Sequence, residues 1–156
     1  MRKAVFPGSF DPFTFGHLDI LNRAQDLFDK IHISIGHNST KKYLNSLAKR
    51  IEMLDELFAE NDAIVVDSYE GLTVNHCQSI EADFIIRGLR NSLDFEYEKT
   101  IAALNKSLSN NIETIFLISD SEYSHISSTI VREIIKHGGP IDHFIPNELI
   151  PHLKNN

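Results

Sequence analysis

Short apolar runs alternate along most of this chain with stretches of helical spacing. The first run covers residues 4–6, and after a polar loop apolar side chains recur at intervals of three and four from Leu18 to Phe28, which is typical of an amphipathic helix. Further strands are predicted at residues 31–35, 63–66, 84–86 and 115–118. The helices predicted between and after them cover residues 47–58, 72–80, 92–108 and 127–137, with a weaker one at 147–153.

This alternation predicts the fold class. Strands separated by helix-length segments imply right-handed crossovers and a mostly parallel sheet that is covered on both faces. We therefore expect a doubly wound α/β fold with a five-stranded sheet. No repeat, low-complexity segment or linker divides the chain, so residues 1–156 are expected to form one domain.

Ligands of such sheets bind beyond the carboxyl ends of the strands. The sequence places polar groups after four of the five strands. They are Ser9 and His17 after the first strand, Lys41 after the second, Arg87 and Arg90 after the fourth, and residues 127–129 after the fifth. These loops should converge on one edge of the sheet.

Composition restricts the class of protein further. A chain of 156 residues with 42% hydrophobic content can bury one sizeable core, and a net charge of -7 argues against a surface built for nucleic acid. The single cysteine, Cys77, excludes an internal disulfide and is expected to be a small buried side chain. No apolar run is long enough to span a membrane, and Met1-Arg2-Lys3 leads into a strand rather than a signal-peptide core. We expect a soluble, cytoplasmic protein that binds neither nucleic acid nor membrane.

The segment Thr14-x-Gly16-His17 offers a phosphate site without either of the common glycine-rich phosphate motifs, which are absent. It combines a hydroxyl, a glycine that a ligand can approach closely, and an imidazole at a helix start, where unpaired N–H groups favour anions. A single histidine in such a place is more often a surface or core-rim residue. The surrounding pattern favours the phosphate site.

Three other polar features allow a functional and a structural interpretation. Arg87 and Arg90 could bind phosphate bidentately, or form ion pairs with Asp94, Glu96 or Glu98. The hydroxyl run Ser127-Ser128-Thr129 could be an ordinary helix N-cap or could bind the outer phosphates of a nucleotide. Lys41 and Lys42 would usually be solvated loop charges, and only their position after the second strand recommends them.

Asp11 and the phenylalanines in and near the first loop also allow both a functional and a structural interpretation. Asp11 could support the loop or contribute to a metal site, but one carboxylate does not make a metal site. Phe10, Phe13 and Phe15 are expected to pack in the core rather than stack against a base.

Five segments, taken in order, resemble the bacterial phosphopantetheine adenylyltransferase family. They are residues 7–17, the Lys41-Lys42 pair, I-R-G-L-R at 86–90, D-F-E-Y-E at 94–98 and I-S-S-T-x-V-R at 126–132. The T-x-G-H element is shared by the wider nucleotidylyltransferase superfamily, whereas I-R-G-L-R followed by D-F-E-Y-E is more particular to this family. The resemblance spans nearly the whole chain and implies a Rossmann-like nucleotidyltransferase fold.

The activity that the resemblance implies is transfer of AMP from ATP to 4'-phosphopantetheine, which gives dephospho-coenzyme A and pyrophosphate in coenzyme A biosynthesis. The acceptor phosphate would attack in line, without a covalent enzyme intermediate. Mg²⁺ would be bound mainly through ATP phosphates and water, with no protein side chain as ligand. The family also forms homohexamers and can be inhibited by coenzyme A.

The resemblance also implies roles for individual residues. The catalytic residues would be His17, as stabiliser of the transition state, with Lys41 and Arg90. Phosphopantetheine would be bound by Ser9, Lys41, Leu72, Thr73 and Arg87. ATP would be bound by Ser9, Phe10, His17, Gly88, Leu89, Arg90, Glu98, Tyr123, Ser124, His125, Ile126, Ser127, Ser128 and Thr129.

Four positions depart from the family pattern. Phe15 stands where a small polar residue is common, and Tyr123 where tryptophan is frequent. Ser9 replaces a threonine and keeps its hydroxyl, while Thr73 replaces a residue that is often apolar. These changes alter the rim of the expected site more than its charges, so they bear on affinity rather than on the reaction.

Two alternatives remain. A related adenylyl- or cytidylyltransferase would act on another phosphate, such as nicotinate mononucleotide or glycerol phosphate, and a panel of acceptors would distinguish it. A nucleotide-binding regulator would retain the fold and bind ATP without giving product. The segment from Arg87 to Arg90 and Glu98 argue against the first alternative. Intact Ser9, His17, Lys41 and Arg90 argue against the second.

Overall fold

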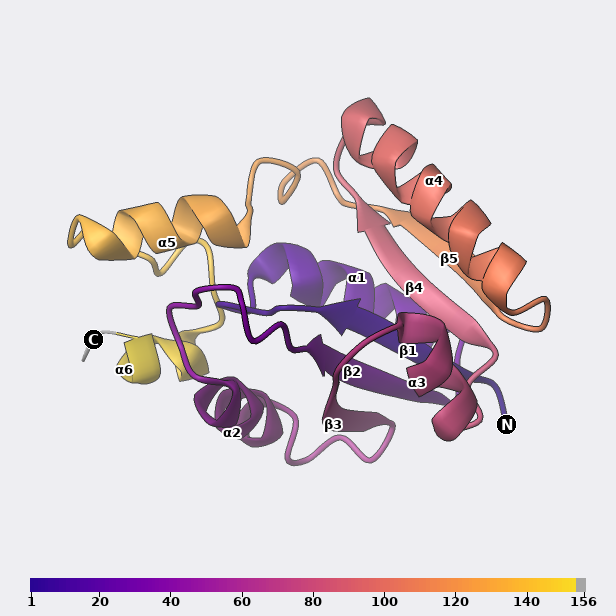
Figure 1. Ribbon diagram of the computed structural model, residues 1–156. Coiled ribbons are helices and arrows are strands. Elements are labelled where there is room, and N and C mark those ends of the chain that lie inside the picture. The colour runs from indigo at the N-terminus through magenta and orange to yellow at the C-terminus, as the bar shows by residue number, and fades with distance from the viewer. Residues whose placement is uncertain (154–156) are drawn as a thin grey trace.

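The computed structural model describes residues 1–153, which form a five-stranded sheet in the order β3-β2-β1-β4-β5 (Figure 1). All four strand pairings are parallel. The strands are β1 (Lys3–Gly8), β2 (Lys30–Gly36), β3 (Ile64–Tyr69), β4 (Phe84–Leu89) and β5 (Glu113–Ile118). The helices are α1 (Phe15–Gln25), α2 (Leu47–Leu57), α3 (Thr73–Ser79), α4 (Ser92–Leu108), α5 (Ser128–Lys136), the 3₁₀ turn η1 (Asn147–Leu149) and α6 (Ile150–Leu153). The doubly wound α/β prediction is confirmed.

The helices cover both faces of the sheet, as neighbouring residues of β4 show. The side chain of Arg87 bonds Glu98 on α4, whereas a Cβ at Gly88 would lie 2.9 Å from the Ile20 side chain on α1. Successive strand residues point to opposite faces, so α1 and α4 lie on opposite sides. The larger apolar core joins α1, α2 and the C-terminal segments to one face, and a smaller cluster on the other face contains Val5, Val74, Cys77, Ala82, Ile85 and Ile112.

The first four strands were predicted to end too early, whereas β5 ends at Ile118 as predicted. β4 continues past Ile86 because Arg87, Gly88 and Leu89 pair in register with β5. Arg87 therefore lies on the strand, not in the loop after it. The sequence pattern missed this because a glycine between two arginines carries no strand signal.

The first helix was predicted too long. α1 ends at Gln25, Leu27 is 41% exposed, and Phe28 is buried just before β2. Phe28 belongs to the core through its contact with Phe84, with ring centroids 5.2 Å apart, and not through helical periodicity. The apolar character of Phe28 therefore correctly indicated a core residue, but its helical spacing did not mean that it belongs to the helix.

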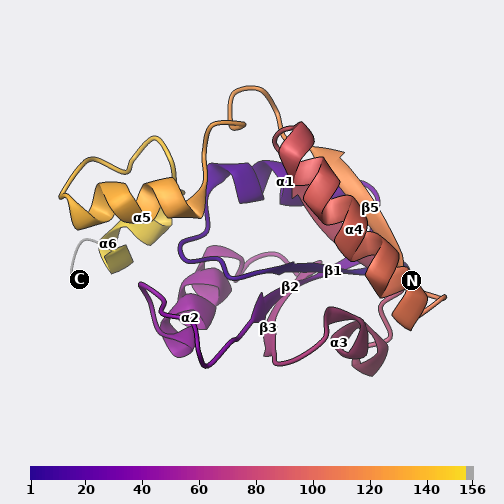
Figure 2. The same ribbon diagram turned by 45° about the horizontal axis from the view of Figure 1, so that its top comes forward.

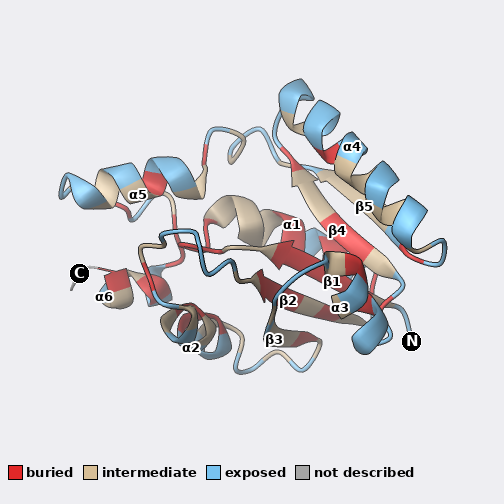
Figure 3. Cartoon of the chain, viewed as in Figure 1, coloured by how far each residue is buried: buried red, intermediate tan, exposed pale blue. Residues whose placement is uncertain are grey.

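Helix α4 lies over β4 and β5 (Figure 2), and most of its residues are exposed or half-buried (Figure 3). Glu98 is its one buried residue, while Leu93, Leu104 and Leu108 are each more than half exposed. Cys77 is fully buried, as predicted, and burial raises the pKa of its thiol to about 12. Among the described residues, no helix combines the length and the apolar character needed to cross a bilayer.

Candidate functional site

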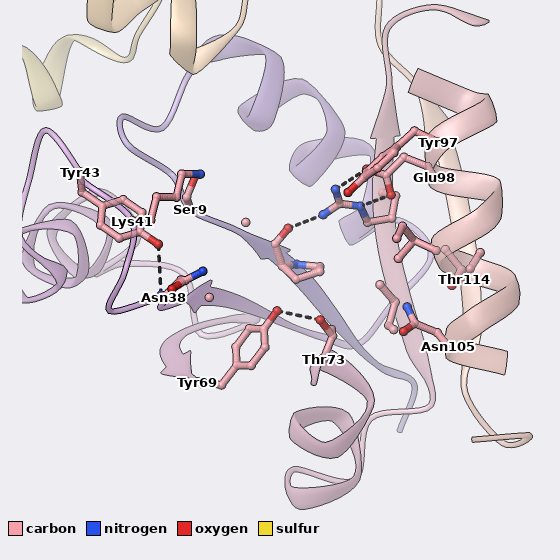
Figure 4. A pocket seen from close by; sticks show the side chains of 17 residues that line it. Ser9, Asn38, Lys41, Tyr43, Tyr69, Thr73, Tyr97, Glu98, Asn105 and Thr114 are labelled. Atoms are coloured by element: carbon pink, nitrogen blue, oxygen red, sulfur yellow. Dashed lines mark hydrogen bonds and ion pairs between the residues drawn. The ribbon is translucent and has the colours of Figure 1, made fainter. Parts of the chain in front are cut away.

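Two adjoining cavities open at the carboxyl ends of the strands, where the sequence places its polar groups. The first, of about 390 Å³, lies against α4 and is called the α4 cavity (Figure 4). Its polar wall contains Ser9, Asn38, Lys41, Tyr43, Tyr69, Thr73, Arg87, Tyr97, Glu98, Asn105 and Thr114, and its apolar wall includes Pro7, Ile85, Ile101 and Ala102. Its lining is of mixed polarity, which suits a ligand with amide and phosphate groups.

The second cavity, of about 310 Å³, lies between the first turns of α1 and α5 and is called the α5 cavity. It is lined by Ser9, Thr14, Gly16, His17, Lys41, Arg87, Gly88, Arg90, Asp94, Glu98, Ser119, Ile126, Ser127, Ser128, Thr129 and Arg132. Its wall therefore includes two helix N-termini and four cationic side chains, a combination that favours a polyanion.

The two cavities share four lining residues: Ser9, Lys41, Arg87 and Glu98. A ligand in either cavity can therefore contact these four residues. The predicted convergence of loops is thus observed, with the loops after β1 and β2, strand β4 and helix α4 each contributing one residue to the junction. Such a junction suits two substrates that react with each other.

The imidazole of His17 is held in one orientation. The backbone N–H of Thr14 donates to Nδ1 at 3.0 Å, and the Thr14 hydroxyl lies 3.1 Å from the same nitrogen. In return, the Thr14 hydroxyl accepts from the His17 N–H and caps α1. Because Nδ1 accepts a hydrogen bond, the neutral ring carries its proton on Nε2, which is free to donate to a ligand.

Three phenylalanines set the surroundings of His17. Phe6, Phe10 and Phe13 pack around its ring, with centroids 5.1 to 6.3 Å away. Burial, together with the charges of Arg87 and Arg90, lowers the pKa of His17 from 6.5 to about 4. The ring is therefore neutral at physiological pH and acts as a hydrogen-bond donor rather than as a cation.

This low pKa predicts that the protein is less stable in mild acid. The unfolded chain binds a proton at this histidine below pH 6.5, while the folded protein takes it up only near pH 4. The contribution of His17 to the free energy of unfolding should therefore be complete above pH 6.5 and be lost progressively as the pH falls to about 4. Urea unfolding at several pH values, with a His17→Gln variant as control, measures it. Equal slopes of free energy against pH in both proteins would contradict the assigned pKa.

The two arginines of I-R-G-L-R both form ion pairs. Arg87 binds Glu98 through two nitrogens, with its Nε 2.8 Å from Oε2, and donates from Nη1 to the Pro7 carbonyl at 2.7 Å. Arg90 binds Asp94 through its backbone N–H and its Nε at 3.0 and 3.1 Å. Burial alone would raise the pKa of Asp94, but these bonds outweigh it and lower the pKa. The ion-pair interpretation is confirmed for both arginines, and each also lines the α5 cavity.

The three hydroxyls at the start of α5 have separate partners. Ser127 caps the helix by accepting from the Ile130 N–H at 3.2 Å. Ser128 donates to the Pro12 carbonyl at 2.8 Å, and Thr129 accepts from Arg132 at 3.1 Å. The N-cap interpretation thus holds for Ser127 alone. Ser128 and Thr129 each retain unused hydrogen-bonding capacity toward the cavity that they line.

Asp11 supports a loop rather than a metal. Its buried carboxylate accepts from the Leu44 N–H at 2.6 Å and from the Asn45 N–H and side-chain amide at 3.0 Å each. Arg132 donates to the Asp11 carbonyl at 2.8 Å. The loop after β1 therefore joins the Lys41 loop to the start of α5.

Comparison with known proteins gives the family. Residues 5–134 match the cytidylyltransferase-like family model. The chain is 50% identical over 147 residues, 94% of its length and 97% of the relative's, to the phosphopantetheine adenylyltransferase of Christiangramia forsetii. This chain belongs to the phosphopantetheine adenylyltransferase family.

Other members of the phosphopantetheine adenylyltransferase family are similarly close. The enzyme of that name from Flavobacterium psychrophilum is 53% identical over 146 residues, which are 94% of this chain and 96% of that protein. The one from Prochlorococcus marinus subsp. pastoris is 45% identical over 153 residues, 98% and 96% of the two chains. The segments that carry the family resemblance therefore lie in a chain that is similar over almost its whole length.

Not every residue assigned by resemblance to the phosphopantetheine adenylyltransferase family lines a cavity. The side chain of Phe10 is buried beneath Gly8, where a Cβ would lie 2.9 Å from its ring. Phe10 and Phe13 thus pack in the core, as predicted, and Phe15 packs against Tyr123 at 6.3 Å. The predicted binding residues outside the lining of both cavities are Phe10, Leu72, Leu89, Tyr123, Ser124 and His125. Their assignment stays a prediction.

Several lining residues were not foreseen from the sequence. They are Asn38, Tyr43, Tyr69, Tyr97, Asn105, Thr114, Ser119 and Arg132. Arg132 is the last residue of I-S-S-T-x-V-R, so its segment pointed to it. The others lie on loops, on strands and on helix α4, which meet only in the folded chain.

Proposed function

We propose that this chain transfers the adenylyl group of ATP to 4'-phosphopantetheine, forming dephospho-coenzyme A and pyrophosphate. The observation that carries the proposal is the junction of the two cavities at Ser9, Lys41, Arg87 and Glu98. The α4 cavity takes the pantetheine arm, the α5 cavity takes ATP, and the two phosphates meet at the junction. The relatives named phosphopantetheine adenylyltransferase support this choice of substrates.

The reaction is one in-line displacement. An oxygen of the acceptor phosphate forms a bond to the α-phosphorus of ATP as the bond from that phosphorus to the bridging oxygen breaks, and pyrophosphate leaves with the electron pair. Lys41 and the Ser9 hydroxyl hold the acceptor phosphate, and Arg90 holds ATP phosphates. The His17 Nε2–H donates to an oxygen of the transferring group as charge develops there, which lowers the barrier most in the transition state.

We propose that Mg²⁺ would enter bound to ATP and would neutralise charge on the leaving pyrophosphate. Within residues 1–153, no group of three histidine, cysteine, aspartate or glutamate side chains could hold a metal ion. The carboxylates that line the α5 cavity, Asp94 and Glu98, are both bound by arginines. We therefore assign the ion's ligands to ATP phosphates and water.

The remaining proposals concern the state of the protein. We propose one nucleotidylyltransferase domain that assembles as a homohexamer in the cytoplasm and is open to inhibition by coenzyme A, which shares the pantetheine arm. Exposed apolar side chains on α4 support self-association, namely Leu93, Leu104 and Leu108. The free, buried Cys77 fits a reducing compartment.

The reaction is tested by measuring pyrophosphate release from Mg²⁺ and ATP, with and without 4'-phosphopantetheine, and by detecting dephospho-coenzyme A by mass spectrometry. We expect release that requires both substrates and one dephospho-coenzyme A per pyrophosphate. Release with nicotinate mononucleotide or glycerol phosphate instead would show that the enzyme uses another acceptor substrate. Tight ATP binding without any product would favour a non-catalytic regulator.

A further inference from the structure

The ammonium of Lys41 lies on a long side chain in a loop between β2 and α2. Among the described residues it has neither a hydrogen bond nor an ion pair, and its backbone N–H bonds the Asn38 carbonyl at 3.0 Å. Its Nζ lies over an aromatic ring, 5.6 Å from the centroid of Tyr43. Figure 4 shows the two side chains together at one end of the α4 cavity, on the side of Ser9.

The ring of Tyr43 is itself fixed. The Arg50 guanidinium lies over it, with Cζ 4.1 Å from the centroid, and His37 stacks beside it at 6.0 Å and an interplanar angle of 25°. The Tyr43 hydroxyl accepts from the Asn38 N–H at 3.2 Å. Two cations therefore share one aromatic ring, and the ring is held from several directions.

Arg50 connects this ring to the junction of the cavities. It is fully buried and donates to the Ser9 carbonyl at 2.7 Å and to the Asn45 carbonyl at 3.2 Å. Within the described chain its Nη2 has no hydrogen-bond partner. Contact with the Tyr43 ring therefore contributes to stabilising the guanidinium. The backbone of Ser9 and the ring of Tyr43 are thus fixed by the same side chain.

We propose that Tyr43 is a positioning residue that holds the Lys41 ammonium at the junction of the two cavities. A lysine side chain loses rotamer freedom when it is held in one place. A fixed ring that attracts the cation restricts the side chain before substrate binds, so less conformational entropy is lost on binding. The inference rests on the proposed function only in assigning the acceptor phosphate as the group that Lys41 contacts. Tyr43 also lines the α4 cavity, and the proposed effect on turnover is the one that it exerts through Lys41.

The kinetic test compares Tyr43→Leu with Tyr43→Phe. Removing the ring should lower kcat about fivefold, the scale of a cation–π contact, with the KM for ATP unchanged. The Phe variant keeps the ring and should restore most of kcat, because only the bond to Asn38 is lost. A Leu variant with unchanged kcat, or a Phe variant as impaired as Leu, would overturn the proposal.

A double-mutant cycle separates positioning from general damage to the loop. If Tyr43 acts through Lys41, Tyr43→Leu should lower kcat in the wild-type background and have no further effect on Lys41→Ala. Lys42→Ala serves as the matched background, since Lys42 lines neither cavity and the full fivefold effect should persist there. Equal losses in all three backgrounds would show that Tyr43 supports the loop without positioning Lys41.

A measurement without turnover keeps this inference separate from the proposed function. In NMR spectra with ¹³C-labelled lysine, ring currents should displace the Lys41 ε-methylene signal in wild type and Tyr43→Phe, and Tyr43→Leu should return it to the position of exposed lysines. An unchanged signal in Tyr43→Leu would overturn the positioning role. Failure of the wild type to form dephospho-coenzyme A would instead refute the proposed function and leave the NMR result to decide the role of Tyr43.

Discussion

Replacing His17 by alanine should lower kcat by about 10²-fold or more while leaving the KM for ATP nearly unchanged, the pattern expected when a transition-state donor is lost. The neutral ring, its fixed orientation and its position in the α5 cavity all assign the donating role to Nε2–H. Steady-state kinetics with both substrates varied measures the two constants. Unchanged turnover would remove His17 from the mechanism.

The two nitrogens of His17 can be tested separately. Asparagine places an oxygen near the position of Nδ1 and can accept from the Thr14 N–H, whereas glutamine places an amide N–H near Nε2. His17→Asn should therefore keep the cap of α1 and lose kcat, while His17→Gln should keep more of kcat. His137→Ala is the matched control because that exposed histidine is the C-cap residue of α5 and lines neither cavity. Equal activity of the Asn and Gln variants would contradict the assigned tautomer.

The architecture could be predicted because apolar spacing and helix-capping residues are both local features of the sequence. Apolar spacing identified the alternation of strands and helices, and parallel topology then placed the ends of β1, β2 and β4 together. Ser9, His17, Lys41 and Arg87 could be expected at one edge before any contact was known. Helix caps were equally local, since Ser127 caps α5 within its own turn.

The walls of the cavities could not be predicted in this way. Tyr69 and Thr73 bond each other across a turn at 2.8 Å, and Asn105 reaches the same cavity from the far end of α4. Their roles depend on the angle between helix and sheet, which apolar spacing does not specify. The partners of Asp11 likewise lie more than thirty positions away, so a lone carboxylate in the sequence gave no sign that it holds the Lys41 loop.

Replacing Arg87 by alanine should raise the KM for 4'-phosphopantetheine about 100-fold, on the scale of losing one partner of a buried, hydrogen-bonded charge pair, and should change the KM for ATP much less. Arg87 lines both cavities at their junction, and it also donates to the carbonyl of Pro7, which lines the α4 cavity. It thus presents its charge where the acceptor phosphate arrives. Titration of the variant with each substrate separates the two constants, and a change confined to the KM for ATP would contradict the assignment.

The same substitution should also destabilise the fold, because Glu98 is only 8% exposed and would lose its bidentate partner. Removing one member of a buried ion pair costs about 3 kcal/mol, since the other charge stays desolvated. An Arg87→Met, Glu98→Leu double variant removes both charges and should recover much of the stability without recovering affinity for the acceptor. Urea unfolding and calorimetric binding on the same samples measure the two effects. Recovery of both together would mean that Arg87 serves the fold alone and that another cation binds the phosphate.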